Sequence, residues 1–143
     1  MPRKVLVEEA LTYSVIGSFF KVYNRLGFGF LEHLYVMALE RELLARGHRV
    51  AREMGVRVFY EGTELGIQRL DMVVDEKLVV ETKSTFDLHK AAQRQVYNYL
   101  KATNLEVGLL LHFGPRPSYH RLYSPNRHAH QIDQVCPVHP DEP

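Results

Sequence analysis

One stretch of the sequence, EVGLLLHFG at residues 106–114, is an almost unbroken apolar run. A half-buried strand alternates polar and apolar side chains, whereas a strand covered on both faces does not. The run therefore predicts a central strand with other elements packed against both of its faces. His112, within this run, is expected to be a satisfied core histidine rather than a catalytic base.

The segments around the run supply the covering elements. Apolar residues recur at spacings of three and four in residues 5–22, 31–46 and 87–102, which is the period of a helix. The first helix is expected to end near NRLGFGF, residues 24–30, where two glycines break the pattern. Three stretches between the second and third helices favour strands separated by polar turns, and a short strand is expected after the apolar run. The strand sequences are RVAREMGVRVFYEG, ELGIQRLDMVVDE, KLVVETKS and SYHRLYS. This order predicts an α/β fold, a mixed sheet of four or five strands with helices on both faces.

Length and composition favour one globular domain. The chain has 143 residues, of which 45% are hydrophobic and 24% charged, as is typical of a folded protein rather than a disordered one. We expect the domain to span residues 1–125. Residues 126–143 are rich in proline and histidine and are expected to form a loosely ordered tail.

The single cysteine, Cys136, excludes an intramolecular disulfide. With three histidines of the tail it could chelate zinc, but the spacing matches no standard zinc site. These histidines are His128, His130 and His139.

The sequence predicts a soluble cytoplasmic protein with no membrane partner, because no apolar run approaches the ~20 residues of a membrane span and the first residues do not resemble a signal peptide. The net charge of +1 gives no overall attraction to polyanions. Nucleic-acid binding would therefore depend on a local basic patch. One region interleaves basic and aromatic residues and could contact phosphates, although a solvated surface explains it equally well. Its members are Arg116, Tyr119, His120, Arg121 and Arg127.

Charged residues interrupt the apolar pattern of QRLDMVVDEKLVVETKS, residues 68–84. If residues 75–77 form a three-residue loop, Asp71 lies directly opposite Glu81, and opposed residues share a face with Cβ atoms about 4.5 to 5.5 Å apart. Lys83 lies on the same face because it follows Glu81 by two positions. A two-residue loop would instead place Asp71 and Glu81 on opposite faces.

Two close carboxylates repel each other, and burial adds to the cost of ionising both. Lys83 can supply part of the compensating charge, and Mg²⁺ or Mn²⁺ could supply the rest because these ions suit oxygen ligands. Such an ion can polarise a phosphoryl oxygen and lower the pKa of a bound water. A charged face on an edge strand can also simply discourage aggregation, so the hairpin alone leaves both interpretations open.

Two motifs outside the hairpin favour the metal-site interpretation of its charged residues. GFLEHLY places Gly29, Glu32 and Tyr35 at the spacing GxxExxY, and QVYNY places Gln95 and Tyr99 four residues apart, on one side of a helix. With the aspartate and E-x-K of the hairpin, the chain resembles the GxxExxY proteins, a branch of the PD-(D/E)XK nuclease-like superfamily with RecB-like motifs. The resemblance extends from about residue 13 to residue 114, with a leucine where the superfamily nominally has a proline before the aspartate.

This resemblance implies a restriction-endonuclease-like fold with an αβββαβ core, and metal-dependent hydrolysis of phosphodiester bonds in DNA rather than RNA. The predicted ligands of Mg²⁺ or Mn²⁺ are Asp71, Glu81, the backbone carbonyl of Thr82 and Glu32. The predicted catalytic residues are Lys83, which would position the attacking water, with Asp71, Glu81, Gln95 and Tyr99.

Structural explanations exist for several of these residues. Glu32 near the start of a helix is favoured by the dipole and by capping alone. Tyr35 is expected to be core rather than ligand, Gly29 to serve a turn, and Gln95 and Tyr99 could simply edge a buried helical stripe. The rival function is a catalytically silent nuclease-fold module that binds nucleic acid or a protein partner. A subunit active only as a homodimer or in a larger complex is a further alternative.

Overall fold

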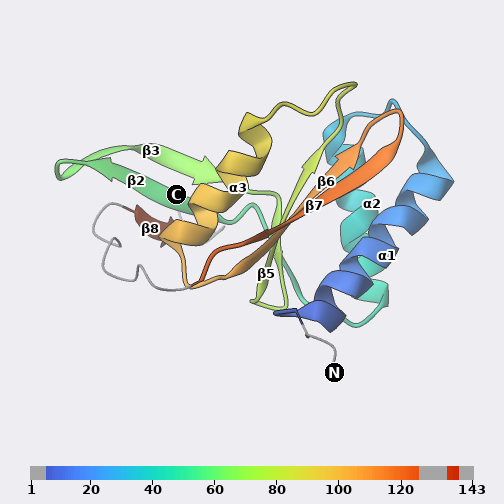
Figure 1. Ribbon diagram of the computed structural model, residues 1–143, viewed down its shortest axis with the longest axis horizontal. Coiled ribbons are helices and arrows are strands. Elements are labelled where there is room, and N and C mark those ends of the chain that lie inside the picture. Colours follow the sequence, from blue (N-terminus) through green and yellow to red (C-terminus); the bar gives the residue numbers. More distant parts are fainter. Residues whose placement is uncertain (1–5, 126–134, 139–143) are drawn as a thin grey trace, which may run out of the picture.

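The computed structural model describes residues 6–125 and 135–138 (Figure 1). The helices are α1 (Glu9–Leu26), α2 (Glu32–Ala45) and α3 (Ala91–Ala102). The strands are β1 (Val50–Arg52), β2 (Gly55–Tyr60), β3 (Thr63–Arg69), β4 (Met72–Val74), β5 (Leu78–Lys83), β6 (Val107–Phe113), β7 (Pro117–Tyr123) and β8 (Val135–Val138).

The main sheet has five strands in the order β1-β4-β5-β6-β7. The β5 and β6 strands are parallel, whereas the other neighbours pair antiparallel. Helices α1 and α2 pack on one face and α3 on the other (Figure 1). Every residue of β6 is buried, as its apolar sequence predicts. The predicted mixed sheet with helices on both faces is confirmed.

A smaller sheet, in the order β3-β2-β8, was not predicted. The two stretches expected as single strands on either side of Gly62 are each divided between the two sheets, so that prediction is wrong. The chain crosses between the sheets where the Leu70 N–H donates to the Met54 carbonyl at 2.7 Å and the Glu53 N–H donates to the Asp71 carbonyl at 2.9 Å. These two hydrogen bonds carry the antiparallel pairing of β1 with β4 over to the pairing of β2 with β3.

Helix α1 ends at Leu26, within the stretch where the sequence predicts its end, because Gly27 takes a φ of 72° that stops the helix. One helix boundary differs from the expected one. Helix α3 begins at Ala91, four residues later than the apolar spacing predicts. The residues between β5 and α3 instead form a loop beside the end of the sheet.

An aromatic cluster fixes the start of α2 against the sheet. The ring of Tyr35 stacks on Phe113 with centroids 4.2 Å apart, and Phe19 meets Phe113 edge-on at 4.8 Å. On the opposite face, α3 approaches the sheet at Gly108, where an added Cβ would lie 2.7 Å from Val96. Both helix layers are therefore held close to β5 and β6.

Of the tail expected over residues 126–143, the structure describes only β8, which pairs antiparallel with β2. The candidate zinc ligands lie outside the described side chains. Within the described residues, no helix combines the length and the apolar composition that crossing a bilayer requires.

Candidate functional site

The β4–β5 hairpin has the register that a three-residue loop predicts. Val74 pairs with Leu78 and Met72 with Val80. Asp71 precedes the first residue of β4, and continuation of the same register places it opposite Glu81. Since Val73 and Val79 pack on the α3 side of the sheet, the alternation of side chains directs the carboxylates toward that side as well.

Asp71 closes the end of this ladder with its side chain. Position 70 would face Thr82, but Leu70 has left the ladder to bond Met54. The Thr82 N–H and the Thr82 Oγ1 hydroxyl instead both donate to Asp71 Oδ2, each at 2.7 Å. In an antiparallel ladder the N–H and C=O of one residue point to the same neighbour. The Thr82 carbonyl therefore points toward the side on which Asp71 lies.

Glu81 is 6% exposed and lacks full compensation for its charge. Lys83 Nζ lies 3.6 Å from Glu81 Oε1, while Oε2 is buried with no hydrogen-bond partner. Burial and the Asp71 carboxylate raise the pKa of Glu81 to about 8, with Glu32 adding to the rise, against the opposing effects of Lys83 and the Asp71 backbone N–H. The carboxyl therefore holds its proton near neutral pH unless a further cation is present.

Glu32 reaches this cluster from the first turn of α2. The Ser84 backbone N–H bonds its carboxylate, and the Ser84 hydroxyl donates to the Phe30 carbonyl at 2.6 Å. Burial foremost, and then the Asp71 carboxylate, raise the pKa of Glu32, while Lys83 and the Ser84 N–H oppose the rise. Glu32 is thus within electrostatic reach of the hairpin charges, and α2 begins against the residue that follows β5.

The other two residues of the GxxExxY motif shape the loop that presents Glu32. Gly29 has a φ of 111°, a conformation that side chains with a Cβ rarely adopt. Tyr35 is fully buried, and its hydroxyl donates to the Gly27 carbonyl and accepts from the Phe30 N–H. Tyr35 is therefore a core anchor, as the sequence predicts.

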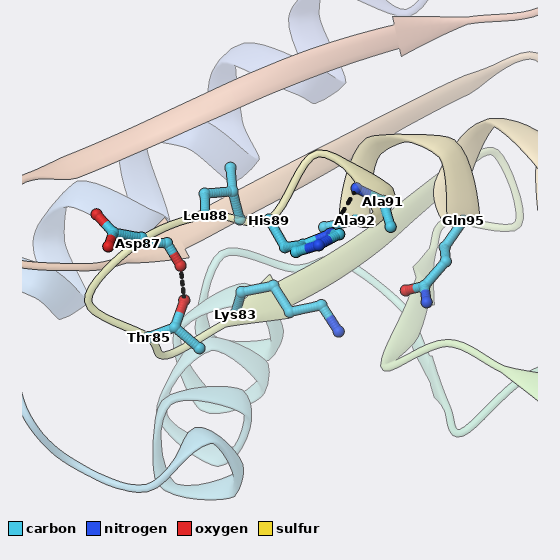
Figure 2. Close-up of a pocket in the computed structure, with 8 residues that line it drawn as sticks. All are labelled: Lys83, Thr85, Asp87, Leu88, His89, Ala91, Ala92 and Gln95. Atoms are coloured by element: carbon cyan, nitrogen blue, oxygen red, sulfur yellow. Dashed lines mark hydrogen bonds between the residues drawn. The ribbon is translucent and has the colours of Figure 1, made fainter.

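The two residues of the QxxxY motif have different environments. Gln95 and Lys83 line the same open hollow, of about 240 Å³, and their side chains point into one space (Figure 2). Tyr99 is 2% exposed and packs in the core under α3, where burial raises its pKa to about 12. In the described part of the chain, no hydrogen bond joins its hydroxyl to Asp71, Glu81 or Lys83.

The basic and aromatic region near β7 is separate from this cluster. Strand β6 lies between β5 and β7. Arg121 donates to the Val7 carbonyl, and the Tyr119 ring packs edge-on against Phe20. His112 is 6% exposed and lies 2.8 Å from the Thr85 carbonyl through Nε2, consistent with a satisfied core histidine. Arg127 lies outside the described residues.

Comparison with known proteins identifies the family. The model of the PD-(D/E)XK nuclease superfamily matches residues 9–122. The chain belongs to this superfamily. Among solved structures, the crystal structure of SSO0001 is similar, with a TM-score of 0.54 and 18% identity over 87% of this chain. This chain covers 64% of the length of that one, and the likeness supports the restriction-endonuclease-like fold. None of the curated proteins matches the chain.

The PD-(D/E)XK superfamily consists generally of nucleases, which hydrolyse phosphodiester bonds and typically use divalent metal ions. The matched range contains Glu32, the three charged hairpin residues and Gln95. The geometry brings these five residues to one end of β5. Sequence reasoning alone missed the contribution of Ser84, whose backbone and hydroxyl join β5 to the loop before α2.

Proposed function

We propose that this chain is a metal-dependent nuclease of the GxxExxY branch that hydrolyses phosphodiester bonds in DNA. The observation that carries the proposal is the buried, unpartnered Oε2 of Glu81 beside the carboxylate of Asp71. A fold gains nothing from two close carboxylates without enough positive charge to compensate them. A bound cation would supply the missing positive charge and would explain why the fold keeps two carboxylates so close together.

The residues present fit Mg²⁺ or Mn²⁺. Carboxylate and carbonyl oxygens are the donors that these ions prefer, and the cluster offers Asp71, Glu81, Glu32 and the Thr82 carbonyl. Among the described residues, no three His, Cys, Asp or Glu side chains already converge as a complete metal-binding group. Ion binding would therefore require the carboxylates of Asp71, Glu81 and Glu32 to move closer together.

Each side chain has a distinct role in this proposal. When bound, the divalent ion would supply Lewis acidity and charge neutralisation at the scissile phosphate. Asp71 and Glu81 would hold it, with Glu32 approaching from α2. Lys83 orients the attacking water and offsets negative charge, and Gln95 donates a hydrogen bond to a phosphate oxygen across the shared hollow. The products would carry 3′-hydroxyl and 5′-phosphate ends.

The direct test is incubation of the purified protein with labelled single- and double-stranded DNA and RNA in Mg²⁺, Mn²⁺ or EDTA. We expect cleavage of DNA with either ion and none in EDTA. Lys83→Ala should abolish cleavage but retain Mn²⁺ binding, because the oxygen ligands remain. Lys77→Ala, in the turn at the far end of the same hairpin, is the matched control and should cleave like the wild type.

One result would refute the nuclease, and another would remove a single residue from its mechanism. Binding of DNA without cleavage in either ion would establish the silent binding module instead. Cleavage by Lys83→Ala at the wild-type rate would remove Lys83 from the mechanism. If the activity per chain rises with protein concentration, the active form is a homodimer or larger assembly.

A further inference from the structure

Large apolar side chains are exposed on two loops at the edge of the candidate site. Phe28 and Phe30 precede α2, and Phe86 follows β5. Their exposed fractions are 45%, 46% and 71%. The rings of Phe28 and Phe86 meet edge-on, with centroids 6.4 Å apart and planes 68° apart. Two segments distant in sequence thus share one exposed aromatic pair, the Phe28/Phe86 pair.

The Phe28/Phe86 pair is continuous with the nuclease site. The Ser84 hydroxyl, directly after β5, donates to the Phe30 carbonyl. This hydrogen bond joins the segment that carries Phe28 to the segment that carries Phe86. Phe86 lies between Thr85 and Asp87, and both of these residues line the hollow that Lys83 enters (Figure 2). A nucleic-acid strand at Lys83 would therefore pass beside the pair.

We propose that Phe28 and Phe86 form a stacking platform for an unpaired base, so that the substrate is single-stranded DNA or a duplex with an unpaired end. The proposal rests on the proposed function and names its substrate class. An edge-on pair leaves a ring face open, and bases stack on such faces in single-strand-binding proteins. Bases inside a duplex already have their faces covered by neighbours, so the platform discriminates against paired DNA.

Charge considerations also favour stacking as a source of affinity. The chain carries a net charge of only +1, and the carboxylates of Glu32 and Glu81 lie within electrostatic reach of both Lys83 and Asp71. Phosphate attraction is therefore weak, and contacts with uncharged bases must supply much of the binding free energy. A platform of this kind adds affinity that added salt does not screen.

The test measures binding without turnover. Fluorescence anisotropy would follow a labelled oligonucleotide of about 12 nucleotides, single-stranded or as a blunt duplex, first in EDTA and then with Ca²⁺. We expect Phe86→Ala and Phe28→Ala to weaken single-strand binding by about 5- to 150-fold, the range of one stacked base. The factor should be equal at about 50 and 200 mM salt, and duplex binding should be weak and unchanged. Tyr13→Ala, which removes an 81% exposed ring from α1, is the matched control.

A second variant gives a spectroscopic readout. The protein contains no tryptophan, so Phe86→Trp introduces a single indole at the platform. We expect single-stranded DNA to quench its fluorescence and to bind with at least wild-type affinity, whereas blunt duplex should leave the fluorescence unchanged.

The outcomes separate the platform from the nuclease proposal. Lost single-strand affinity in Phe86→Ala together with no cleavage by the wild type would keep the platform and refute the nuclease. Cleavage by the wild type together with unchanged single-strand affinity in both alanine variants would keep the nuclease and refute the platform. If Phe86→Ala converts a sedimenting dimer to a monomer without altering oligonucleotide affinity, the rings contact a second copy of the chain and the platform is refuted.

Discussion

The substitution Glu81→Gln should stabilise the metal-free protein, and increasingly so as the pH rises. In the unfolded chain Glu81 ionises near its ordinary pKa of 4.5, whereas in the folded protein burial and Asp71 raise that pKa to about 8. Between these values the folded state keeps a proton that the unfolded state has lost. The stability contribution is thus complete below pH 4.5 and is lost as the pH rises toward 8.

The magnitude follows from the same interval. At about 1.4 kcal/mol for every pH unit, the interval from 4.5 to about 8 limits the penalty to about 5 kcal/mol above pH 8, and to about 3 kcal/mol at pH 7. Glutamine keeps the shape of the side chain and does not ionise. The free energy of unfolding of Glu81→Gln should therefore not decrease in this way as the pH rises.

Urea unfolding in EDTA at about pH 5, 7 and 9 would measure both profiles. The difference in the free energy of unfolding between the variant and the wild type should grow by several kcal/mol across this range. Saturating Mn²⁺ should restore the stability of the wild type at high pH. Glu76→Gln, an exposed change in the same hairpin, is the control and should run parallel to the wild type. Parallel profiles for Glu81→Gln would refute the argument that Glu81 is uncompensated.

Three further substitutions test individual residues. Asp71→Asn should weaken Mn²⁺ binding while leaving the melting temperature equal or higher, since it removes the repulsion with Glu81; a fall of several degrees with unchanged Mn²⁺ affinity would instead make Asp71 part of a structural ion pair. Tyr99→Phe should cleave DNA like the wild type because its ring is in the core; a loss of about tenfold or more would return Tyr99 to the catalytic set. Tyr35→Phe should cost about 1 to 3 kcal/mol in chemical denaturation, because the Gly27 carbonyl loses its partner, and a neutral result would contradict the anchoring role.

The register of the β4–β5 hairpin could be predicted because sequence alternation leaves little freedom. A shift of β5 by one residue would turn Val79 away from α3 and would direct the Glu81 carboxyl into the apolar layer under α1 and α2. Positive φ values at Asp75 and Glu76 allow the three-residue loop to close. Local pattern and turn geometry therefore agree on one pairing.

The division of the strands between two sheets could not be predicted in this way. Alternation continues across Glu53 and Met54, and nothing local there signals a change of sheet. The change depends on hydrogen bonds to Leu70 and Asp71, which are distant in sequence. Helical spacing likewise places Gln95 and Tyr99 on one side of α3, but it does not reveal that packing covers Tyr99 and leaves Gln95 exposed.

The late start of β4 connects the fold to the site. Because β4 begins only at Met72 and Leu70 bonds Met54 instead, the N–H and carbonyl of Thr82 lack the strand neighbour that would have paired with them. The Asp71 side chain takes over the N–H through Oδ2, and the carbonyl becomes available as a ligand on the same side. An aspartate meets both requirements, since Oδ2 completes the ladder while Oδ1 would offer a second oxygen to a cation. An asparagine could complete the ladder with its carbonyl oxygen but would present an amide nitrogen to the ion. The structural role of Asp71 and the catalytic role that we propose for it would therefore belong to one arrangement, and they separate only when metal affinity and stability are measured on the same variant.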